Sequence, residues 1–187
     1  MERLLLHSCC GPCTLYPLRA LREEGYAPEG YFYNPNIHPY REFRSRAAAY
    51  RDAARACGLE AEVEEAYGLA MFLAGIRQLG DGAFLPASAE RCRVCYRLRM
   101  EKTATKCAER GIGAFTTTLL VSPYQDHALI REAGEAAAQA HGVAFLYRDF
   151  RPGFRQGQAE AREMGLYMQG YCGCVFSEYA RYGEPAP

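Results

Sequence analysis

A short apolar segment runs directly into three cysteines near the start of the chain, in the stretch "LLLHSCCGPC" at residues 4–13. In a parallel α/β sheet, the loop that follows such a strand lies at the carboxyl edge, where ligands bind. Loops at this position often hold a phosphate group at a helix N-terminus. Because this loop carries thiols, it predicts an α/β protein whose active edge performs metal or redox chemistry.

The length and composition fit one domain. The chain has 187 residues, of which 49% are hydrophobic, and we expect a single α/β catalytic domain over 1–183 with a frayed tail at 184–187. The 22 basic and 22 acidic side chains cancel, so a nucleic-acid partner would need a local basic patch. No stretch resembles a signal peptide or a spanning helix, and we expect a soluble, cytoplasmic protein with no membrane partner.

Strands and amphipathic helices alternate along the chain. This order favours a mostly parallel sheet with helices on both faces. The region 79–90 has two glycines, a proline and little periodicity, and is predicted to be a loop. We expect strands at 3–8, 30–36, 60–66, 113–120 and 143–150, helices at 14–24, 39–57, 67–78, 91–111 and 126–141, and one more helix after the last strand.

Most of the nine cysteines fall into three groups. Clustered cysteines in a cytosolic chain indicate metal binding or redox chemistry rather than structural disulfides. Cys57 and Cys107 stand alone at predicted helix ends, where a cysteine is usually a small hydrophobic residue. The groups are Cys9, Cys10 and Cys13, then Cys92 and Cys95, and finally Cys172 and Cys174.

Each group has a spacing with a chemical meaning. Cys92 and Cys95 lie one turn apart at the start of a predicted helix, where amide groups and the helix dipole stabilise thiolates. Cys172 and Cys174 are separated by one glycine, and we interpret them as a redox pair. Four thiolates from a Cys-Cys step and a Cys-x-x-Cys step can hold structural zinc or an iron–sulfur cluster, and pure thiol chemistry is a third possibility.

Six motifs resemble the epoxyqueuosine reductase QueH family and occur in that family's order. They are "LHSCCGPC", "YFYNPNIHPYREFRSR", "RCRVCYRLRMEKTA", "FTTTLLVSPYQDH", "YRDF" and "LYMQGYCGCVFS". The resemblance implies a tRNA-modifying oxidoreductase that reduces epoxyqueuosine at the wobble position to queuosine without cobalamin. It also implies a HUP-like sheet, similar to that of PP-loop nucleotide enzymes, in which the phosphate loop has become "SCCGPC".

The resemblance also implies roles for particular residues. Cys172 and Cys174 match a redox-active disulfide of the family. A mononuclear iron beside the cluster is implied too, with Cys13 and Asp149 as candidate ligands, and an unidentified electron donor is required. The residues that match the ligands of a [4Fe-4S] cluster are Cys9, Cys10, Cys92 and Cys95.

Contacts with tRNA are expected from arginines and tyrosines near the motifs. Arginines recur in the predicted helix 39–57 and around the Cys-x-x-Cys step, and tyrosines offer stacking surfaces for the bases of an RNA loop. Such arginine runs are also typical of solvated helix faces. The candidate substrate-binding residues are Tyr33, Tyr40, Tyr96, Tyr171, Arg93 and Arg97.

Other polar residues have structural interpretations. We expect His7 to be a hydrogen-bonded core histidine, His38 to be a turn residue and Asp126 to cap a helix. Two functions from other classes remain open. One is an ATP-dependent PP-loop enzyme that thiolates tRNA, although no glycine-rich phosphate turn follows the first strand, and the other is a zinc-stabilised binding module without catalysis.

Overall fold

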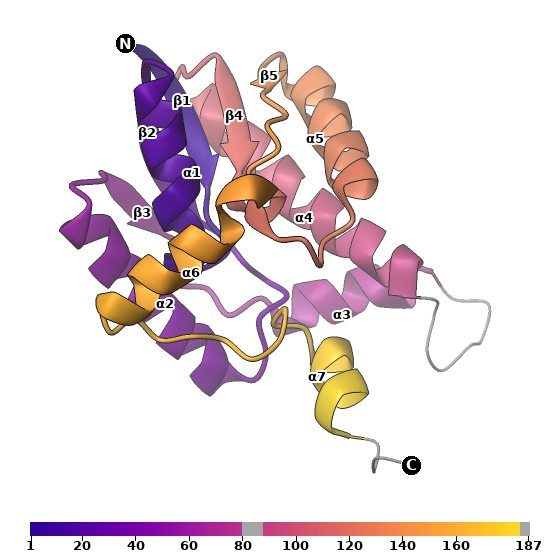
Figure 1. The fold of residues 1–187 in the computed structure, drawn as a ribbon. Coiled ribbons are helices and arrows are strands. Elements are labelled where there is room, and N and C mark those ends of the chain that lie inside the picture. Colours follow the sequence, from indigo (N-terminus) through magenta and orange to yellow (C-terminus); the bar gives the residue numbers. More distant parts are fainter. Residues whose placement is uncertain (80–87, 184–187) are drawn as a thin grey trace.

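Five parallel strands form one sheet in the order β3-β2-β1-β4-β5 (Figure 1). The computed structural model describes residues 1–79 and 88–183, so the predicted tail at 184–187 lies outside the described residues. Leu4, Leu5 and Leu6 are fully buried because β1 lies at the centre of the sheet. The strands are β1 (Glu2–His7), β2 (Tyr26–Phe32), β3 (Ala61–Val63), β4 (Ala114–Thr117) and β5 (Ala144–Phe145). The expected parallel α/β fold is confirmed.

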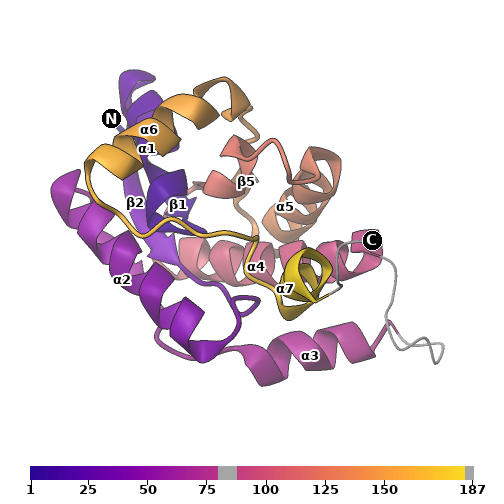
Figure 2. The ribbon, with the colours of Figure 1, turned by 60° about the horizontal axis from the view of Figure 1, so that its bottom comes forward.

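Helices cover both faces of the sheet, as Figures 1 and 2 show. One layer contains α1 and α2, with α6 packed on α1, and the other contains α4 and α5. No helix within the described ranges is long and apolar enough to cross a membrane. The helices are α1 (Gly11–Glu23), α2 (Tyr40–Ala56), α3 (Leu69–Arg77), α4 (Ser88–Glu109), α5 (His127–His141), α6 (Phe154–Glu163) and α7 (Val175–Tyr182), with short 3-10 helices at Thr118–Val121 and Arg151–Gly153.

Several element boundaries differ from the expectations. The first helix begins at Gly11 rather than at residue 14, because the Cys10 thiol caps it by accepting a hydrogen bond from the Cys13 backbone N–H. The second strand spans Tyr26–Phe32 rather than 30–36, because residues 26–31 are the ones that pair with β1. The last strand is only two residues long, and two helices follow it where the sequence predicted one.

The chain reverses its winding direction between the two central strands. The connections that lead from β1 to β2 and β3 lie on one face of the sheet, whereas α5, which connects β4 to β5, lies on the other face. His7 is paired with Thr117, so both strands end at the same level. In doubly wound folds this switch point opens a crevice at the carboxyl ends of the strands. The "SCCGPC" loop therefore enters this crevice directly from β1.

The buried side chain of Arg46 attaches the C-terminal segment to α2. Its guanidinium donates to the backbone carbonyls of Tyr171 and Cys172 at 2.9 and 3.1 Å, and it pairs with Glu42 at 2.6 Å. Only 2% of the residue is exposed. The sequence placed Arg46 in an arginine run that could face tRNA. The structure corrects this, because the Arg46 guanidinium is buried and bound to Glu42 and to two backbone carbonyls.

We expect Arg46→Gln to lower the free energy of unfolding by about 3 to 5 kcal/mol, since breaking a buried ion pair leaves Glu42 and two carbonyls without their partner. Urea unfolding measures the change. Arg51→Gln is the matched control, because this arginine of the same helix forms an exposed ion pair with Glu65 and its loss costs less than about 1 kcal/mol. Equal losses in the two variants would contradict the structural role of Arg46.

A cysteine-lined candidate active site

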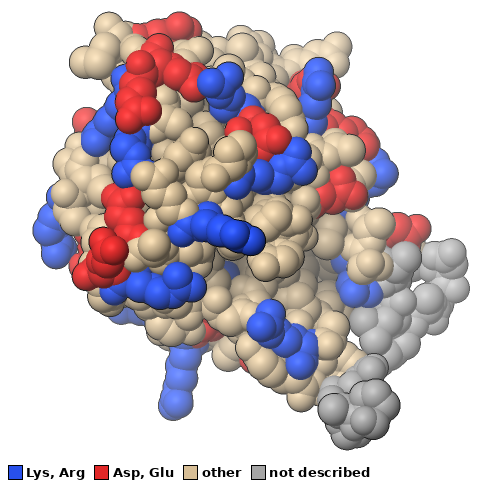
Figure 3. Space-filling view, viewed as in Figure 1, with Lys and Arg blue, Asp and Glu red and all other residues tan. Residues whose placement is uncertain are grey.

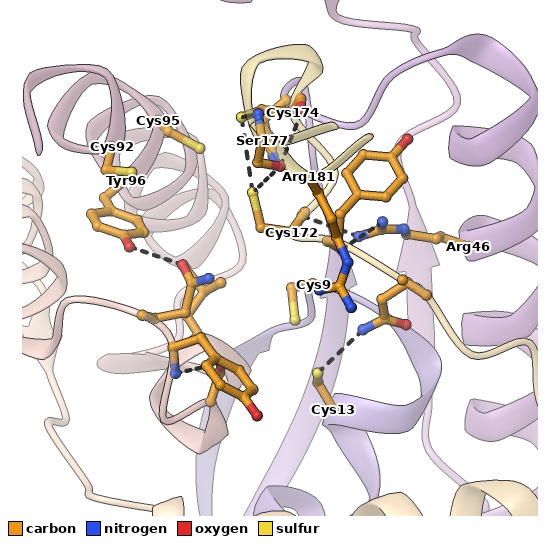
Figure 4. Close-up of a pocket in the computed structure, with 18 of the residues that line it drawn as sticks. Cys9, Cys13, Arg46, Cys92, Cys95, Tyr96, Cys172, Cys174, Ser177 and Arg181 are labelled. Carbon is orange, nitrogen blue, oxygen red and sulfur yellow. Dashed lines mark hydrogen bonds between the residues drawn. The ribbon is translucent and has the colours of Figure 1, made fainter. Parts of the chain in front are cut away.

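A pocket of about 960 Å³ lies at the carboxyl edge of the sheet, bordered by α4, α6 and α7. It brings together cysteines from all three sequence groups, which lie up to 165 positions apart in the chain. Figure 4 shows the cysteines of α4 on one side and the thiol of Cys172 facing the same space. The lining cysteines are Cys9, Cys13, Cys92, Cys95, Cys172 and Cys174.

The first group forms a compact cluster of thiols. The sulfur atoms of Cys9, Cys10 and Cys13 all lie within 4.8 Å of one another, a spacing that could hold a metal ion. Cys9 is anchored from β4, because its backbone N–H donates to the Thr118 hydroxyl at 3.0 Å. The same hydroxyl donates to the Cys9 sulfur at 3.4 Å. The loop after β1 and the residue after β4 are thus fixed to each other at the switch point.

Within this cluster, the three thiols shift one another's pKa values in opposite directions. Hydrogen bonds from the Cys10 and Cys13 thiols, and one from Thr118, hold the pKa of Cys9 well below its usual value. Burial raises the pKa of Cys10. The pKa of Cys13 is also raised, first by the hydrogen bonds that its thiol gives to Cys10 and Cys9. The hydrogen bonds among the three thiols therefore favour ionisation of Cys9 over that of Cys10 and Cys13. A bound cation would favour ionisation of all three, because metal ligands are thiolates.

Cys92 and Cys95 project from α4 toward the pocket (Figure 4). The helix begins at Ser88, so both residues lie beyond its first turn and its free amide groups. The expectation that these amides stabilise thiolates was wrong. Burial raises the pKa of Cys92, and it raises that of Cys95 to about 11. Arg99 partly offsets this effect, because its buried guanidinium donates to the Cys95 sulfur at 3.0 Å.

Cys172 and Cys174 form a close pair of free thiols beside the same space. Their sulfur atoms are 3.8 Å apart, and Gly173 between them adopts a φ of 115° that a glycine accepts without strain. Hydrogen bonds from the Cys174 thiol and from Ser177 lower the pKa of Cys172 to about 5. The pKa of Cys174 is raised, first because its proton is held by Cys172 and then because of burial. The pair therefore favours a thiolate at Cys172 beside a protonated thiol at Cys174.

Three polar side chains at the site were not identified from the sequence. Gln169 donates from its amide to the Cys10 sulfur at 2.8 Å, while its carbonyl oxygen is buried without a partner. Ser177 bonds the Cys172 sulfur at 2.9 Å, and Thr118 bonds Cys9. Gln169 and Ser177 lie within the "LYMQGYCGCVFS" motif, and Ser177 is only five positions from Cys172, but nothing in the sequence indicates that Gln169 contacts a cysteine more than 150 positions away.

The structure brings only some of the expected ligand and substrate residues to the pocket. Tyr96 and Tyr171 line it. Asp149 does not, and its carboxylate binds Arg151 at 2.6 Å. The remaining candidates also lie outside the lining. Cys10 is buried beside Cys9 and Cys13. Tyr33 is buried against Met71, Tyr40 packs on Tyr67, Arg93 pairs with Glu132, and Arg97 is exposed on α4.

The structural interpretations of other residues are confirmed. His7 is fully buried and hydrogen-bonded at both ring nitrogens, to Thr117 and to the Tyr33 carbonyl. The Asp126 carboxylate caps α5 by accepting from the Leu129 N–H. Cys107 is buried in the main core, away from the pocket. His7, Asp126 and Cys107 therefore make structural contacts and do not line the pocket.

The charge around the pocket is one-sided, although the whole chain is neutral. Among the described residues that line it, none is Asp or Glu. Lys and Arg side chains lie over α6 and α7 on the face shown in Figure 3. Soft thiolate donors without carboxylates suit iron–sulfur centres or zinc better than magnesium or calcium, so the donor set fits a thiolate-bound metal. The lining arginines are Arg46, Arg91, Arg99, Arg155, Arg162 and Arg181.

Comparisons with known proteins identify the family of this chain. The sequence model of the family described as epoxyqueuosine reductase QueH matches residues 4–180. A protein of that name from Dehalococcoides mccartyi is 38% identical over 98% of this chain and 96% of its own length. One from Thermotoga maritima is 34% identical over 95% of this chain and 91% of its own length.

A solved structure supports the fold independently. It is described as a predicted subunit of tRNA methyltransferase from Methanocaldococcus jannaschii, and it aligns with a TM-score of 0.55 over 87% of this chain and 75% of that chain. At 11% identity this likeness concerns the fold alone. The family match covers nearly all of the residues that form the sheet and the pocket. This chain belongs to the epoxyqueuosine reductase QueH family.

Proposed function

We propose that the cysteine-lined pocket is the site at which this chain converts epoxyqueuosine in tRNA into queuosine. The observation that carries this proposal is the meeting of three separate cysteine groups in one pocket at the switch point of the sheet. Family membership supplies the reaction, and a switch point is where doubly wound folds bind their ligands. No observation favours ATP-dependent thiolation or a non-catalytic zinc module over this assignment.

The reaction requires electrons and protons that a dithiol can supply. Conversion of an epoxide to an alkene breaks two C–O bonds, consumes two electrons and two protons, and releases water. Oxidation of Cys172 and Cys174 to a disulfide would release two electrons and two protons, which balances the reaction. Their 3.8 Å separation supports a role as the redox-active pair. An external electron donor must then reduce the disulfide again.

We propose Cys9, Cys10, Cys92 and Cys95 as the ligands of a [4Fe-4S] cluster, and Cys13 as a ligand of an adjacent iron. When bound, these centres would supply single electrons and Lewis acidity toward an oxygen atom. The first cysteine group is already compact, and the α4 pair lines the same pocket. The soft donor set supports this assignment but also suits zinc.

The surrounding residues stabilise charge in this pocket. Arg99 is buried and donates to the Cys95 sulfur, so it can balance part of the negative charge of clustered thiolates. Gln169 orients the Cys10 sulfur through its amide group. Tyr96 holds the Gln125 side chain at the rim with a hydrogen bond of 2.8 Å. Fixed donors of this kind stabilise developing charge without reorganisation during the reaction.

The first test is conversion of tRNA that carries epoxyqueuosine by anaerobically purified, metal-loaded protein. Mass spectrometry of the digested nucleosides should show the loss of one oxygen atom. We expect Cys172→Ser to lose this activity with an enzymatic electron donor, because the variant cannot form the disulfide. Cys57→Ser, which changes a cysteine outside the pocket, should keep wild-type activity. A wild-type rate for Cys172→Ser with chemical and enzymatic donors alike would contradict the relay.

The second test is the visible absorption spectrum of the anaerobic protein, with iron, acid-labile sulfide and zinc assayed on the same sample. We expect a brown protein that contains iron and sulfide in similar amounts. Cys92→Ser should lose most of the absorption because one ligand is removed, and Cys57→Ser should retain it. A colourless protein that binds zinc, before and after reconstitution, would refute the cluster assignment.

The third test is the alkylation of Cys172 in the reduced, metal-free protein. Because its pKa is about 5, Cys172 is already a thiolate at neutral pH, and its rate with iodoacetamide should be nearly constant between about pH 6 and 8. Burial raises the pKa of Cys57, so its rate should rise about tenfold per pH unit. Ser177→Ala should shift the Cys172 profile to higher pH. A Cys172 profile parallel to that of Cys57 would contradict the thiolate.

A further inference from the structure

Tyr124 is an exposed aromatic residue at the mouth of the pocket. It lies in the turn between β4 and α5, lines the pocket, and is 82% exposed. Its ring meets the Phe154 ring edge to face, with centroids 5.9 Å apart and an interplanar angle of 84°. This contact orients the tyrosine while most of its surface stays free. A large aromatic side chain in this position offers a flat apolar surface to whatever enters the pocket.

Three arginines surround the same opening from two helices. Arg155 and Arg162 belong to α6 and Arg181 belongs to α7. Within residues 1–79 and 88–183 none of them forms an ion pair with a carboxylate. Some exposed arginines elsewhere do, such as Arg93 with Glu132 and Arg131 with Glu135. The opening therefore combines uncompensated positive charge with an exposed aromatic ring.

This combination matches the chemistry of single-stranded RNA. Aromatic rings stack on unpaired bases, and the planar guanidinium group binds phosphate oxygens with two parallel hydrogen bonds. A base that enters the pocket from an RNA loop leaves its neighbouring nucleotides at the mouth. Those neighbours would meet an aromatic ring and arginines at this opening. Arg181 reaches over the pocket from α7 in Figure 4, so the positive charge also extends above the thiols.

We infer that Tyr124 stacks on a base next to the modified nucleotide, and that Arg155, Arg162 and Arg181 bind the phosphates on either side. This inference rests on the proposed function for the identity of the RNA, an anticodon loop. It locates the RNA contact at the rim formed by the β4–α5 turn, α6 and α7. The arginines of the outer face of α4, Arg93 and Arg97, lie outside this rim.

The test is the binding of a fluorescent, unmodified anticodon stem-loop RNA to the anaerobic holoprotein, measured by anisotropy over a range of salt concentrations. Tyr124→Ala should weaken binding between about five- and 100-fold, because one stacked base is lost. Tyr124→Phe should stay within about twofold of wild type, since the stacking surface remains. The double variant Arg155→Gln/Arg162→Gln should lower the slope of log K against log salt by about 1.4, at about 0.7 per phosphate contact.

The matched control is the double variant Arg93→Gln/Arg97→Gln, which removes the same charge from exposed positions of α4. It should leave both the dissociation constant and the salt slope close to wild type. Wild-type binding by Tyr124→Ala together with an unchanged slope for the α6 variant would overturn the inference, as would a larger effect of the control. Absence of RNA binding by the wild-type holoprotein would overturn it too.

The conversion assay separates this inference from the proposed function. If the wild-type protein reduces epoxyqueuosine in tRNA and Tyr124→Ala does so with an unchanged KM, the inference fails and the function stands. If the wild type binds RNA through Tyr124 and these arginines but converts no epoxyqueuosine, the inferred RNA contact is supported and the proposed function is refuted. A raised KM with little change in kcat for Tyr124→Ala would support both.

Discussion

The pairing of β1 with β4 at the centre of the sheet is the constraint on which the site depends. It places His7 beside Thr117, so the thiol loop and the threonine turn leave the sheet together, and the Thr118 hydroxyl can hold Cys9 from both its N–H and its sulfur. The helices on either side then follow opposite faces, which opens the crevice above these residues. The pocket is a consequence of the sheet topology.

Burial of clustered thiols disfavours their ionisation, and two arrangements in the structure oppose this effect. Inside the first group, hydrogen bonds from the Cys10 and Cys13 thiols lower the pKa of Cys9, whereas the pKa values of Cys10 and Cys13 are raised. Around α4, the buried cation Arg99 partly offsets the effect of burial on the pKa of Cys95. Both arrangements leave polarisable sulfur facing a pocket whose described lining has no carboxylate. A positively charged centre would be stabilised by these thiols, and an anionic RNA would be attracted to the rim.

Cys172 and Cys174 reach the pocket in a segment that has little regular secondary structure. Residues 166–174 form no long helix or strand, and Arg46 on α2 binds the carbonyls of Tyr171 and Cys172. The sequence indicates that Cys172 and Cys174 act together, because one glycine separates them. It does not indicate that Arg46 of α2 binds this segment, since a run of arginines is typical of a solvated helix face. Burial of that one side chain distinguishes a structural cation from a surface cation.

The sequence by itself determined the α/β alternation, the placement of thiols directly after the first strand, and the capping role of Asp126. These features depend on interactions between residues a few positions apart, such as side-chain periodicity and hydrogen bonds within one turn. Only the tertiary structure decided that Gln169 and Thr118 contact the thiol loop, that Asp149 does not line the pocket, and that arginines of α6 and α7 do. Those contacts join segments more than 100 positions apart, and packing of the whole fold selects them.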